Sequence, residues 1–361
     1  MIKICIILGT RPEIIKMSPI IRECQKKHIN FFILHTNQHY SENLDKIFFE
    51  ELELPKPKYN LRVGSGTHAE ETGKMLIGIE RVLMMEKPDV VLVEGDTNTA
   101  LAGALAAAKL LIKVGHLEAG ARSYFREMPE EINRVLIDHL SDYLFTSVLG
   151  EKDILLGEGV SKKKIFVTGN TIVDAVYQNL KLAKKKSKIL EKLGLRKGEY
   201  FLVTAHRQEN VDKKEKLNGI LGGLNLVHRK LKLSLIFPIH PRTEKRIKDF
   251  KLKIPKGVKL IKPIGYLDFL NLENNARLIF TDSGGVQEES CVLKIPCLVL
   301  RNNNEWPEML KIGSSILAGA KPQKILRGAG KMLRKKRNWE NPLGDGKSGK
   351  KILAILTRKY L

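Results

Sequence analysis

The strongest constraint on this chain is a repeated unit, in which a short apolar, β-branched run leads through a turn into a stretch with helical periodicity. In the first half of the chain these runs occupy residues 3–8, 31–35, 90–94, 113–117, 143–146 and 165–167. In the second half they occupy residues 200–204, 234–238, 258–261, 278–281, 297–300 and 315–317. Short apolar runs that alternate with helices are typical of parallel sheets built from βαβ units. The sequence therefore predicts an α/β protein.

Length and the spacing of these runs predict two domains. The chain has 361 residues, which is more than one hydrophobic core usually organises. A lysine-rich helix over about 171–192 and a linker over 194–200 separate the two sets of strands. We expect two doubly wound, Rossmann-like domains, 1–170 and 171–340, with a C-terminal helix in 341–361 that packs back on the first domain. Ligands of open α/β sheets bind beyond the carboxyl ends of the strands, so we expect the ligand in a central cleft.

Composition and charge exclude several classes of protein. Lys and Arg total 63 against 40 Asp and Glu, giving a net charge of +23 that would attract polyanions. The lysines are spread along the chain without an RRM, KH or zinc-finger pattern, which favours solvated helix faces over nucleic-acid binding.

The four cysteines form no CxxC pair and no metal-ligand spacing, so we expect reduced thiols and no metal. No cleavable leader and no membrane-spanning apolar stretch are recognised, so we expect a cytoplasmic protein without a membrane partner.

The segment 281–289, TDSGGVQEE, lies between an apolar strand and the start of a helix. The backbone N–H groups of Ser283, Gly284 and Gly285 can face an anion there, and the glycines permit close approach. The acidic residues that follow, Glu289 among them, suit the hydroxyls of a sugar or ribose. The alternative is a plain tight turn with Ser283 as the helix N-cap. We favour a site for a nucleotide diphosphate.

The turn after the first strand, Gly9-Thr10-Arg11-Pro12-Glu13, carries a second set of candidate diphosphate ligands. Arg11 provides a guanidinium, and Lys16 follows one helical turn later on a similar face. The alternative is that Pro12 only starts the helix and Arg11 only pairs with Glu13. The turn after the strand at 200–204 adds His206, which could titrate near neutral pH or hydrogen-bond a phosphate.

Three carboxylates are candidates for proton transfer. Asp96 and Glu118 each follow an apolar strand, where partial desolvation raises a carboxylate pKa into a useful range. The alternatives are that Asp96 is a helix N-cap and that Glu118 pairs with Arg122 or Arg134. In MPEEINR, residues 128–134, a proline in the first helical turn places Glu130 at the end that faces the crevice. Arg134, four residues on, is expected to hold one carboxylate.

Two common nucleotide fingerprints are missing. Gly64-Ser65-Gly66 has no third glycine at position 69, and Gly346-Lys347-Ser348 has Asn341 in place of the leading glycine of a P-loop. Neither NAD nor ATP is indicated, and we expect no cofactor.

Seven motifs together resemble the non-hydrolysing UDP-N-acetylglucosamine 2-epimerases. They are GTRPEIIKMSP from residue 9, EGDTNT from 94, HLEAGARS from 116, MPEEINR from 128, FVTGNTIVDA from 166, TAHRQEN from 204 and TDSGGVQEE from 281, followed by NPLGDGKSGKKI from 341. The resemblance covers nearly the whole chain. It implies a glycosyltransferase-B-like fold, a homodimer, and interconversion of UDP-GlcNAc and UDP-ManNAc by loss of UDP to a 2-acetamidoglucal intermediate and its re-addition.

The resemblance also implies roles for individual residues. The C2 proton is not next to a carbonyl, so its removal is coupled to departure of UDP. The implied catalytic residues are Asp96, Glu118, Glu130 and His206, supported by Arg134. The implied UDP contacts are Arg11, Lys16, His206, Phe269, Ser283, Gly284, Gly285 and Glu289.

Two features set limits on the resemblance. Trp306 stands where many bacterial members carry an arginine, so no ribose or phosphate contact is carried over to this position. Bacterial members can bind a second UDP-GlcNAc as an activator, and Gln38, Arg207 and His240 match that site, whereas Ser41 replaces a glutamine. A glycosyltransferase of the same architecture and a hydrolysing epimerase remain alternatives, because the fold serves all three reactions.

Overall fold

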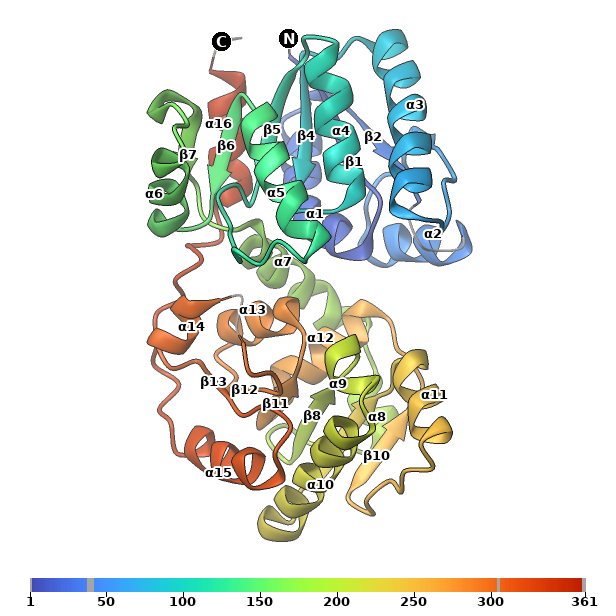
Figure 1. The fold of residues 1–361 in the computed structure, drawn as a ribbon, viewed down its shortest axis with the longest axis vertical. Helices are drawn as coiled ribbons and strands as arrows, with labels where there is room; N and C mark the ends of the chain where they lie inside the picture. The colour runs from blue at the N-terminus through green and yellow to red at the C-terminus, as the bar shows by residue number, and fades with distance from the viewer. Residues whose placement is uncertain (1, 38–41, 304–305, 359–361) are drawn as a thin grey trace. The chain divides into compact units, whose positions relative to one another are not determined.

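The computed structural model describes residues 2–37, 42–303 and 306–358, and the chain forms two compact units (Figure 1). Unit 1 comprises Met1–Gln178 and Leu343–Leu361, and unit 2 comprises Asn179–Pro342. The division falls within α7 (Thr171–Lys186), later than the boundary at residue 170 that the sequence suggested. Among the described residues, no helix combines the length and apolar character needed to cross a bilayer.

Unit 1 is built on a seven-stranded parallel sheet in the order β3-β2-β1-β4-β5-β6-β7. Its strands are β1 (Lys3–Leu8), β2 (Asn30–His35), β3 (Tyr59–Asn60), β4 (Val90–Glu94), β5 (Lys113–Leu117), β6 (Tyr143–Thr146) and β7 (Ile165–Val167). The strand order reverses between β1 and β4, which is the switch point where open α/β sheets place their ligands.

Helices cover both faces of this sheet. They are α1 (Arg11–Lys26), α2 (Glu42–Glu51), α3 (His68–Glu86), α4 (Asn98–Lys109), α5 (Pro129–Leu140), α6 (Leu149–Gly157), the first part of α7, and α16 (Ser348–Thr357), with a 3₁₀ turn at Lys162–Lys164. On one face α3, α4 and α5 lie side by side, and their apolar stripes close over alternate residues of β1, β4 and β5.

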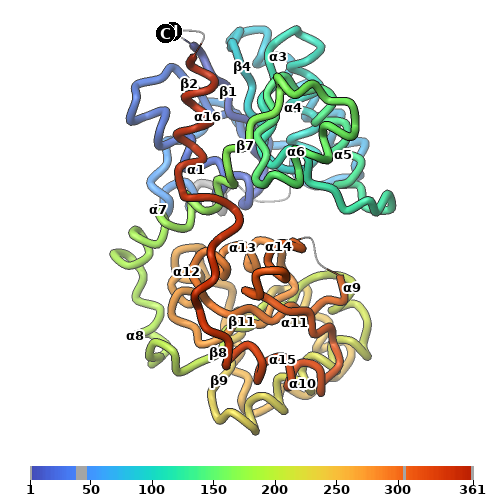
Figure 2. The backbone as a smooth tube through the Cα atoms, turned by 90° about the vertical axis from the view of Figure 1, so that its left-hand side faces the viewer, coloured from blue at the N-terminus to red at the C-terminus, as the bar shows by residue number. Residues whose placement is uncertain are grey.

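The chain returns to unit 1 at its last described helix. Figure 2 shows α16 running beside α1, to which it packs. Asp174 of α7 accepts hydrogen bonds from the backbone N–H groups of Ser348 and Gly349, both at 3.1 Å, and so satisfies donors in the first turn of α16.

Unit 2 holds a six-stranded parallel sheet in the order β10-β9-β8-β11-β12-β13. Its strands are β8 (Tyr200–Thr204), β9 (Ser234–Pro238), β10 (Val258–Ile261), β11 (Leu278–Thr281), β12 (Cys297–Val299) and β13 (Ser315–Leu317). Its helices are the remainder of α7, α8 (Ile189–Leu193), α9 (Gln208–Val211), α10 (Lys214–Leu231), α11 (Pro241–Asp249), α12 (Tyr266–Asn275), α13 (Gly284–Val292), α14 (Pro307–Lys311) and α15 (Pro322–Leu333). One apolar core lies under α10 and α15, and another lies under α8, α12 and α13.

These two sheets confirm the predicted α/β class with two parallel, doubly wound sheets. The single helix expected over about 171–192 is divided into α7 and α8, since Ser187 turns its hydroxyl to Asp268 at 2.6 Å. The two-residue β3 was not predicted from the sequence. It pairs with β2 through Leu34 and Tyr59, and so short an edge strand leaves no apolar run to recognise.

Candidate active site

Parallel register places the candidate carboxylates at one edge of the sheet in unit 1. Strand β4 pairs with β5 from Val90↔Lys113 to Glu94↔Leu117, so both strands end together. Glu118 therefore follows β5 directly, and Asp96 lies two residues beyond β4. Backbone turns with positive φ follow both strands, at Gly95 (70°) and at Glu118 itself (64°). A non-glycine residue in this region is uncommon and often marks a functional position.

Asp96 is held by an arginine on α5. Nε of Arg134 donates to its Oδ2 at 2.8 Å and NH2 lies 2.5 Å from the same oxygen, and the Asp96 side chain stays 27% exposed. Burial raises the pKa of Asp96 above its ordinary value, although Arg134 opposes this. Asp96 is not the N-cap of α4, as one interpretation of the sequence held. Thr97 fills that position and accepts from the N–H of Ala100 at 3.0 Å.

Glu118 is held by a lysine on α1. The ammonium of Lys16 contacts its Oε1, and Nδ2 of Asn170 donates to the same oxygen at 2.6 Å. Burial alone would raise the pKa of Glu118, but the charge of Lys16 and the hydrogen bonds from Lys16 and Asn170 outweigh it and lower the pKa. The pairing of Glu118 with Arg122 or Arg134 that the sequence left open is wrong, because Arg122 binds Asp138 and Glu158 instead.

Lys16 also contacts a carboxylate that sequence reasoning missed. Glu94, the last residue of β4, is buried, and its Oε1 lies 3.5 Å from the Lys16 ammonium. Burial raises the pKa of Glu94 well above its usual range. Asn170 was missed as well, although its position just after β7 follows the same strand-end rule that identified the other site residues. Lys16, which we expected at the diphosphate, is thus engaged with two carboxylates in this structure.

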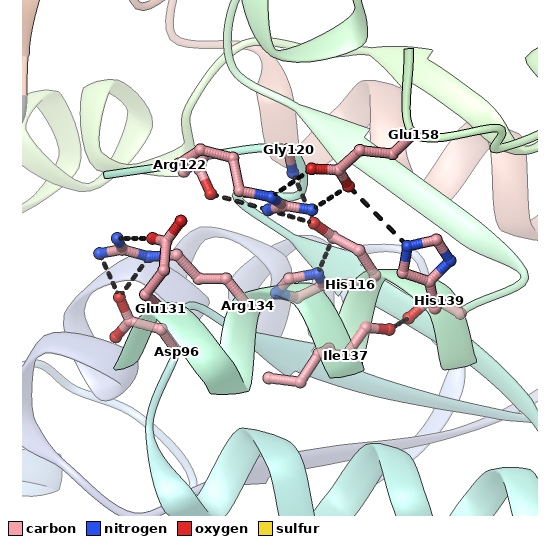
Figure 3. Close-up of polar contacts among 12 residues, drawn as sticks. Asp96, His116, Gly120, Arg122, Glu131, Arg134, Ile137, His139 and Glu158 are labelled. Atoms are coloured by element: carbon pink, nitrogen blue, oxygen red, sulfur yellow. Dashed lines mark hydrogen bonds and ion pairs between the residues drawn. The ribbon is translucent and has the colours of Figure 1, made fainter. Parts of the chain in front are cut away.

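The two adjacent glutamates of α5 have different surroundings. Glu130, in the first turn, is exposed. Glu131 is buried and accepts hydrogen bonds from Ser123 N at 2.8 Å, Tyr124 N at 2.9 Å and Arg134 NH1 at 3.1 Å. Arg134 therefore holds Asp96 and Glu131 together (Figure 3). The sequence placed both glutamates on this turn but gave no signal of which one is tied to the preceding loop.

The turn after β1 is organised around a buried glutamate. Glu13 Oε2 accepts from Gly9 N at 2.9 Å and Thr10 N at 2.7 Å, and its Oε1 accepts from Thr97 Oγ1 at 2.6 Å. A Cβ at Gly9 would lie 2.1 Å from Thr36 Oγ1, so this position requires glycine. Glu13 links the turns after β1 and β4, while the Arg11 guanidinium at the start of α1 lies 5.8 Å from the centre of the Phe48 ring.

In unit 2, an aspartate organises the turn after β8. Asp282 follows β11, is buried, and accepts from His206 N at 3.0 Å and Arg207 N at 3.1 Å. Nδ1 of His206 also lies 3.5 Å from an Asp282 oxygen. Burial lowers the pKa of His206, Asp282 opposes the shift, and the nearby Arg207 and His240 add to it. His206 is therefore held at the carboxyl edge of the second sheet with its side chain 36% exposed.

The expected diphosphate cradle forms the start of α13. Ser283 is the N-cap residue, and its N–H donates to Thr281 Oγ1 at 2.9 Å. Gly284 and Gly285 open the helix, where backbone N–H groups and the helix dipole favour an anion. A Cβ built on Gly285 meets no atom within 4 Å, so the described fold does not itself require glycine there.

Glu289, on α13, belongs to a buried polar group with two residues of α12. The hydroxyl of Tyr266 donates to Glu289 Oε1 at 2.8 Å. Glu273 is fully buried, and burial together with the neighbouring Glu289 raises its pKa well above the usual range. Phe269 lies on α12 and is partly buried against the adjoining apolar core. Sequence reasoning missed Tyr266 and Glu273, because only the packing of α12 on this unit brings them to Glu289.

The residues matched to an activator site are only partly described. Arg207 and His240 follow neighbouring strands of unit 2, and the rings of His206 and His240 are 5.6 Å apart. Gln38 and Ser41 lie outside the described residues, so nothing is said of their placement. Trp306 is the residue before α14 and is partly exposed. Within the described residues, no group of three or more His, Cys, Asp or Glu side chains could hold a metal ion.

Comparison with known proteins identifies the family. The family model described as UDP-N-acetylglucosamine 2-epimerase matches residues 22–357. UDP-N-acetylglucosamine 2-epimerases of Methanocaldococcus jannaschii and Methanococcus maripaludis are 59% and 57% identical to this chain, covering 98% and 99% of it and 99% and 98% of their own lengths. A crystal structure of the M. jannaschii UDP-GlcNAc 2-epimerase in complex with UDP-GlcNAc and UDP aligns with a TM-score of 0.90 at 59% identity, covering 99% of this chain and 100% of that chain. Since these matches span both units, the chain belongs to the UDP-N-acetylglucosamine 2-epimerase family.

Proposed function

We propose that this chain is an isomerase that interconverts UDP-GlcNAc and UDP-ManNAc without releasing the free sugar. The observation that carries the proposal is the placement of Asp96 and Glu118 just beyond the paired ends of β4 and β5, each held by a cation. Burial raises the pKa of Asp96, whereas Lys16 and Asn170 lower that of Glu118 against the effect of burial. Two carboxyl groups whose pKa values are shifted in opposite directions suit the roles of general acid and general base at one carbon. The full-length similarity to family members supports the same substrate.

In the proposed reaction, Glu118 removes the proton at C2 of the sugar. The electrons of the C2–H bond form the C1=C2 double bond of a 2-acetamidoglucal, and the C1–O bond breaks so that its electrons leave with UDP. Asp96 then delivers a proton to C2 on the opposite face, and a phosphate oxygen of UDP attacks C1 again. Proton exchange with water restores both carboxyl groups. Glu130 is proposed as the third carboxylate of this reaction, on the strength of its position in MPEEINR.

UDP is proposed to be retained mainly by unit 2. The first turn of α13, with Ser283, Gly284 and Gly285, binds the diphosphate, and Glu289 accepts hydrogen bonds from ribose hydroxyls while Tyr266 orients it. His206, together with the guanidinium of Arg11 and the ammonium of Lys16, would stabilise the negative charge that develops on the departing phosphate. Phe269 is proposed as an apolar contact of the nucleotide.

We further propose an activator site, a homodimer and a cytoplasmic location for this chain. Arg207 and His240 are proposed to bind a second UDP-GlcNAc as an activator, because they follow the paired strands β8 and β9. A homodimer is proposed because Ile132, Val135 and Leu136 form an exposed apolar face on α5. The four buried cysteines are free thiols, which supports a reducing, cytoplasmic location.

Deuterium exchange tests the proposed reaction. UDP-GlcNAc incubated with the protein in D₂O should acquire deuterium at C2 and yield UDP-ManNAc without an acceptor. A glycosyltransferase would require an acceptor, and a hydrolysing epimerase would accumulate free UDP and N-acetylmannosamine in a phosphorus NMR time course. If the protein binds UDP-GlcNAc and catalyses no exchange at C2, the proposal is wrong.

A further inference from the structure

A cluster of titratable side chains, formed by His116, Asp138, Arg122 and Glu158, contacts the turns that follow β4 and β5. Figure 3 shows this cluster between His116 and Glu158. His116, on β5, is 1% exposed. Its Nδ1 lies 2.7 Å from Asp138 Oδ1, and its Nε2 lies 2.8 Å from the carbonyl oxygen of Gly95. A carbonyl oxygen only accepts, and an ionised carboxylate only accepts. Both contacts of His116 are therefore satisfied together when both ring nitrogens carry protons.

Asp138, on α5, connects this histidine to the second turn. Its Oδ2 accepts from Gly120 N at 3.1 Å and lies 2.7 Å from NH1 of Arg122. Arg122 continues the chain through two hydrogen bonds to Glu158, at 2.8 and 2.6 Å. Burial alone would raise the pKa of Asp138, but His116 and Arg122 outweigh it and lower the pKa, so this buried group is an anion between two donors.

The two backbone atoms held by this cluster belong to the carboxylate turns. Gly95 immediately precedes Asp96, and Gly120 comes two residues after Glu118. Three backbone positions in these turns have positive φ, at Gly95 (70°), Glu118 (64°) and Gly120 (84°). Such conformations persist when surrounding contacts fix them. A Cβ at Gly120 would lie 2.5 Å from the carbonyl oxygen of Glu151, so this position requires glycine.

We propose that His116 and Asp138 are positioning residues that hold the Asp96 and Glu118 turns in one fixed geometry for proton transfer at C2. His116 anchors the first turn through the Gly95 carbonyl, and Asp138 anchors the second through the Gly120 N–H. Neither side chain touches the substrate in this proposal. The inference rests on the proposed epimerisation, because it assigns both carboxylates to the same carbon.

Substitution of either His116 or Asp138 should lower the rate of the chemical step and leave the affinity for UDP unchanged. His116→Asn shortens the side chain and loses the Gly95 contact, and Asp138→Asn removes the negative charge. A displacement of about 1 Å at a catalytic group can lower the rate roughly 100-fold, and we expect a loss of this order in kcat and in C2 deuterium exchange. The Kd for UDP, measured by calorimetry, should stay within about twofold, because the proposed UDP ligands do not contact this cluster.

His139 provides a matched control. It follows Asp138 on α5, is half exposed, and lies 3.9 Å from Glu158 at the outer end of the same cluster. His139→Asn should leave kcat and UDP affinity unchanged. Folded His116→Asn and Asp138→Asn variants with the kcat of the wild type would overturn the proposal. So would a parallel loss of kcat and UDP affinity, which would indicate a purely structural role.

A measurement on the wild-type protein keeps the test decisive even if the variants do not fold. In ¹⁵N-histidine-labelled protein, the ring of His116 should show protons on both nitrogens, in slow exchange with water as expected for a buried group. A ring that lacks the Nε2 proton would contradict the anchor to Gly95. Because this spectrum needs no turnover, it separates failure of the positioning proposal from failure of the proposed function, which the wild-type deuterium exchange reports.

Discussion

Lys16 and Glu118 form a partly buried ion pair that joins the second turn of α1 to the residue after β5. The same ammonium lies 3.5 Å from Glu94, so one cation serves two carboxylates. In the proposed reaction, removal of the C2 proton requires Glu118 to be ionised, and Lys16 is the main charge that keeps the pKa of Glu118 low. Substitution of Lys16 should therefore change the pH dependence of the proposed reaction.

Lys16→Met should move the acidic limb of the pH–rate profile to higher pH. The pKa of Glu118 is lowered in the folded protein, so activity is present above that pKa and is lost as the pH falls through it. Without the ammonium the pKa of Glu118 rises, and the loss begins at a higher pH. The measurement is kcat at saturating UDP-GlcNAc across the pH range. Lys26→Met, an exposed lysine of the same helix, is the control, and an unshifted profile for Lys16→Met would show that Glu118 is not the titrating base.

Asp96→Asn and Glu118→Gln should each reduce kcat by about 10²- to 10⁴-fold, the usual contribution of a general acid or base. Both variants remove a titrating proton at nearly constant side-chain volume. The Kd for UDP should change little, and deuterium exchange at C2 should fall with kcat. Wild-type exchange in either variant would remove that residue from the proton-transfer steps.

Glu130→Gln tests the exposed carboxylate of α5 against a close neighbour. Both Glu127 and Glu130 are exposed near the start of α5, but only Glu130 is proposed to take part in the reaction. We expect Glu130→Gln to lower kcat by about 100-fold, at the low end of acid–base contributions, and Glu127→Gln to leave it unchanged. Equal effects of the two substitutions would assign the loss to local charge.

Gly285→Ala should separate ligand binding from folding. A methyl group there meets no atom of the described structure, and replacing glycine by alanine within a helix stabilises it by roughly 0.5–1 kcal/mol. We therefore expect an unchanged or higher melting temperature, together with UDP affinity weakened about tenfold or more if the phosphate occupies that space. Gly73→Ala, on α3 with the same open surroundings, is the control for the helix effect. Unchanged UDP affinity in Gly285→Ala would argue against a close approach of phosphate.

Glu273→Gln should stabilise the protein at neutral pH. The pKa of Glu273 is raised in the folded state, so the folded protein holds a proton that the unfolded chain releases, and stability falls as the pH rises from the unfolded pKa toward the folded one. One such proton changes stability by about 1.4 kcal/mol per pH unit. Thermal unfolding of both proteins at pH 4 and pH 7 should show a gain for the variant that is larger at pH 7. A gain that is independent of pH would rule out this protonation.

The sequence predicted the fold and the positions of the site more fully than it predicted the contacts at the site. Strand bounds such as those of β1, β4 and β11 follow from short apolar runs, and the strand-end rule then located Asp96, Glu118 and Asp282. The partners of these residues depend on which helix crosses above each strand end. For this reason the pairing of Glu118 with Lys16, 102 residues away in the chain, could not be obtained from local spacing.

Unit 1 is discontinuous, since Leu343–Leu361 joins Met1–Gln178 while the whole of unit 2 is encoded between them. During synthesis, unit 2 can leave the ribosome and fold before the helix that completes unit 1 exists. Until then, Asp174 lacks the N–H groups of Ser348 and Gly349 that it binds in the finished protein. A nascent chain can therefore complete unit 2 first, and docking of α16 would be a late event in the assembly of unit 1.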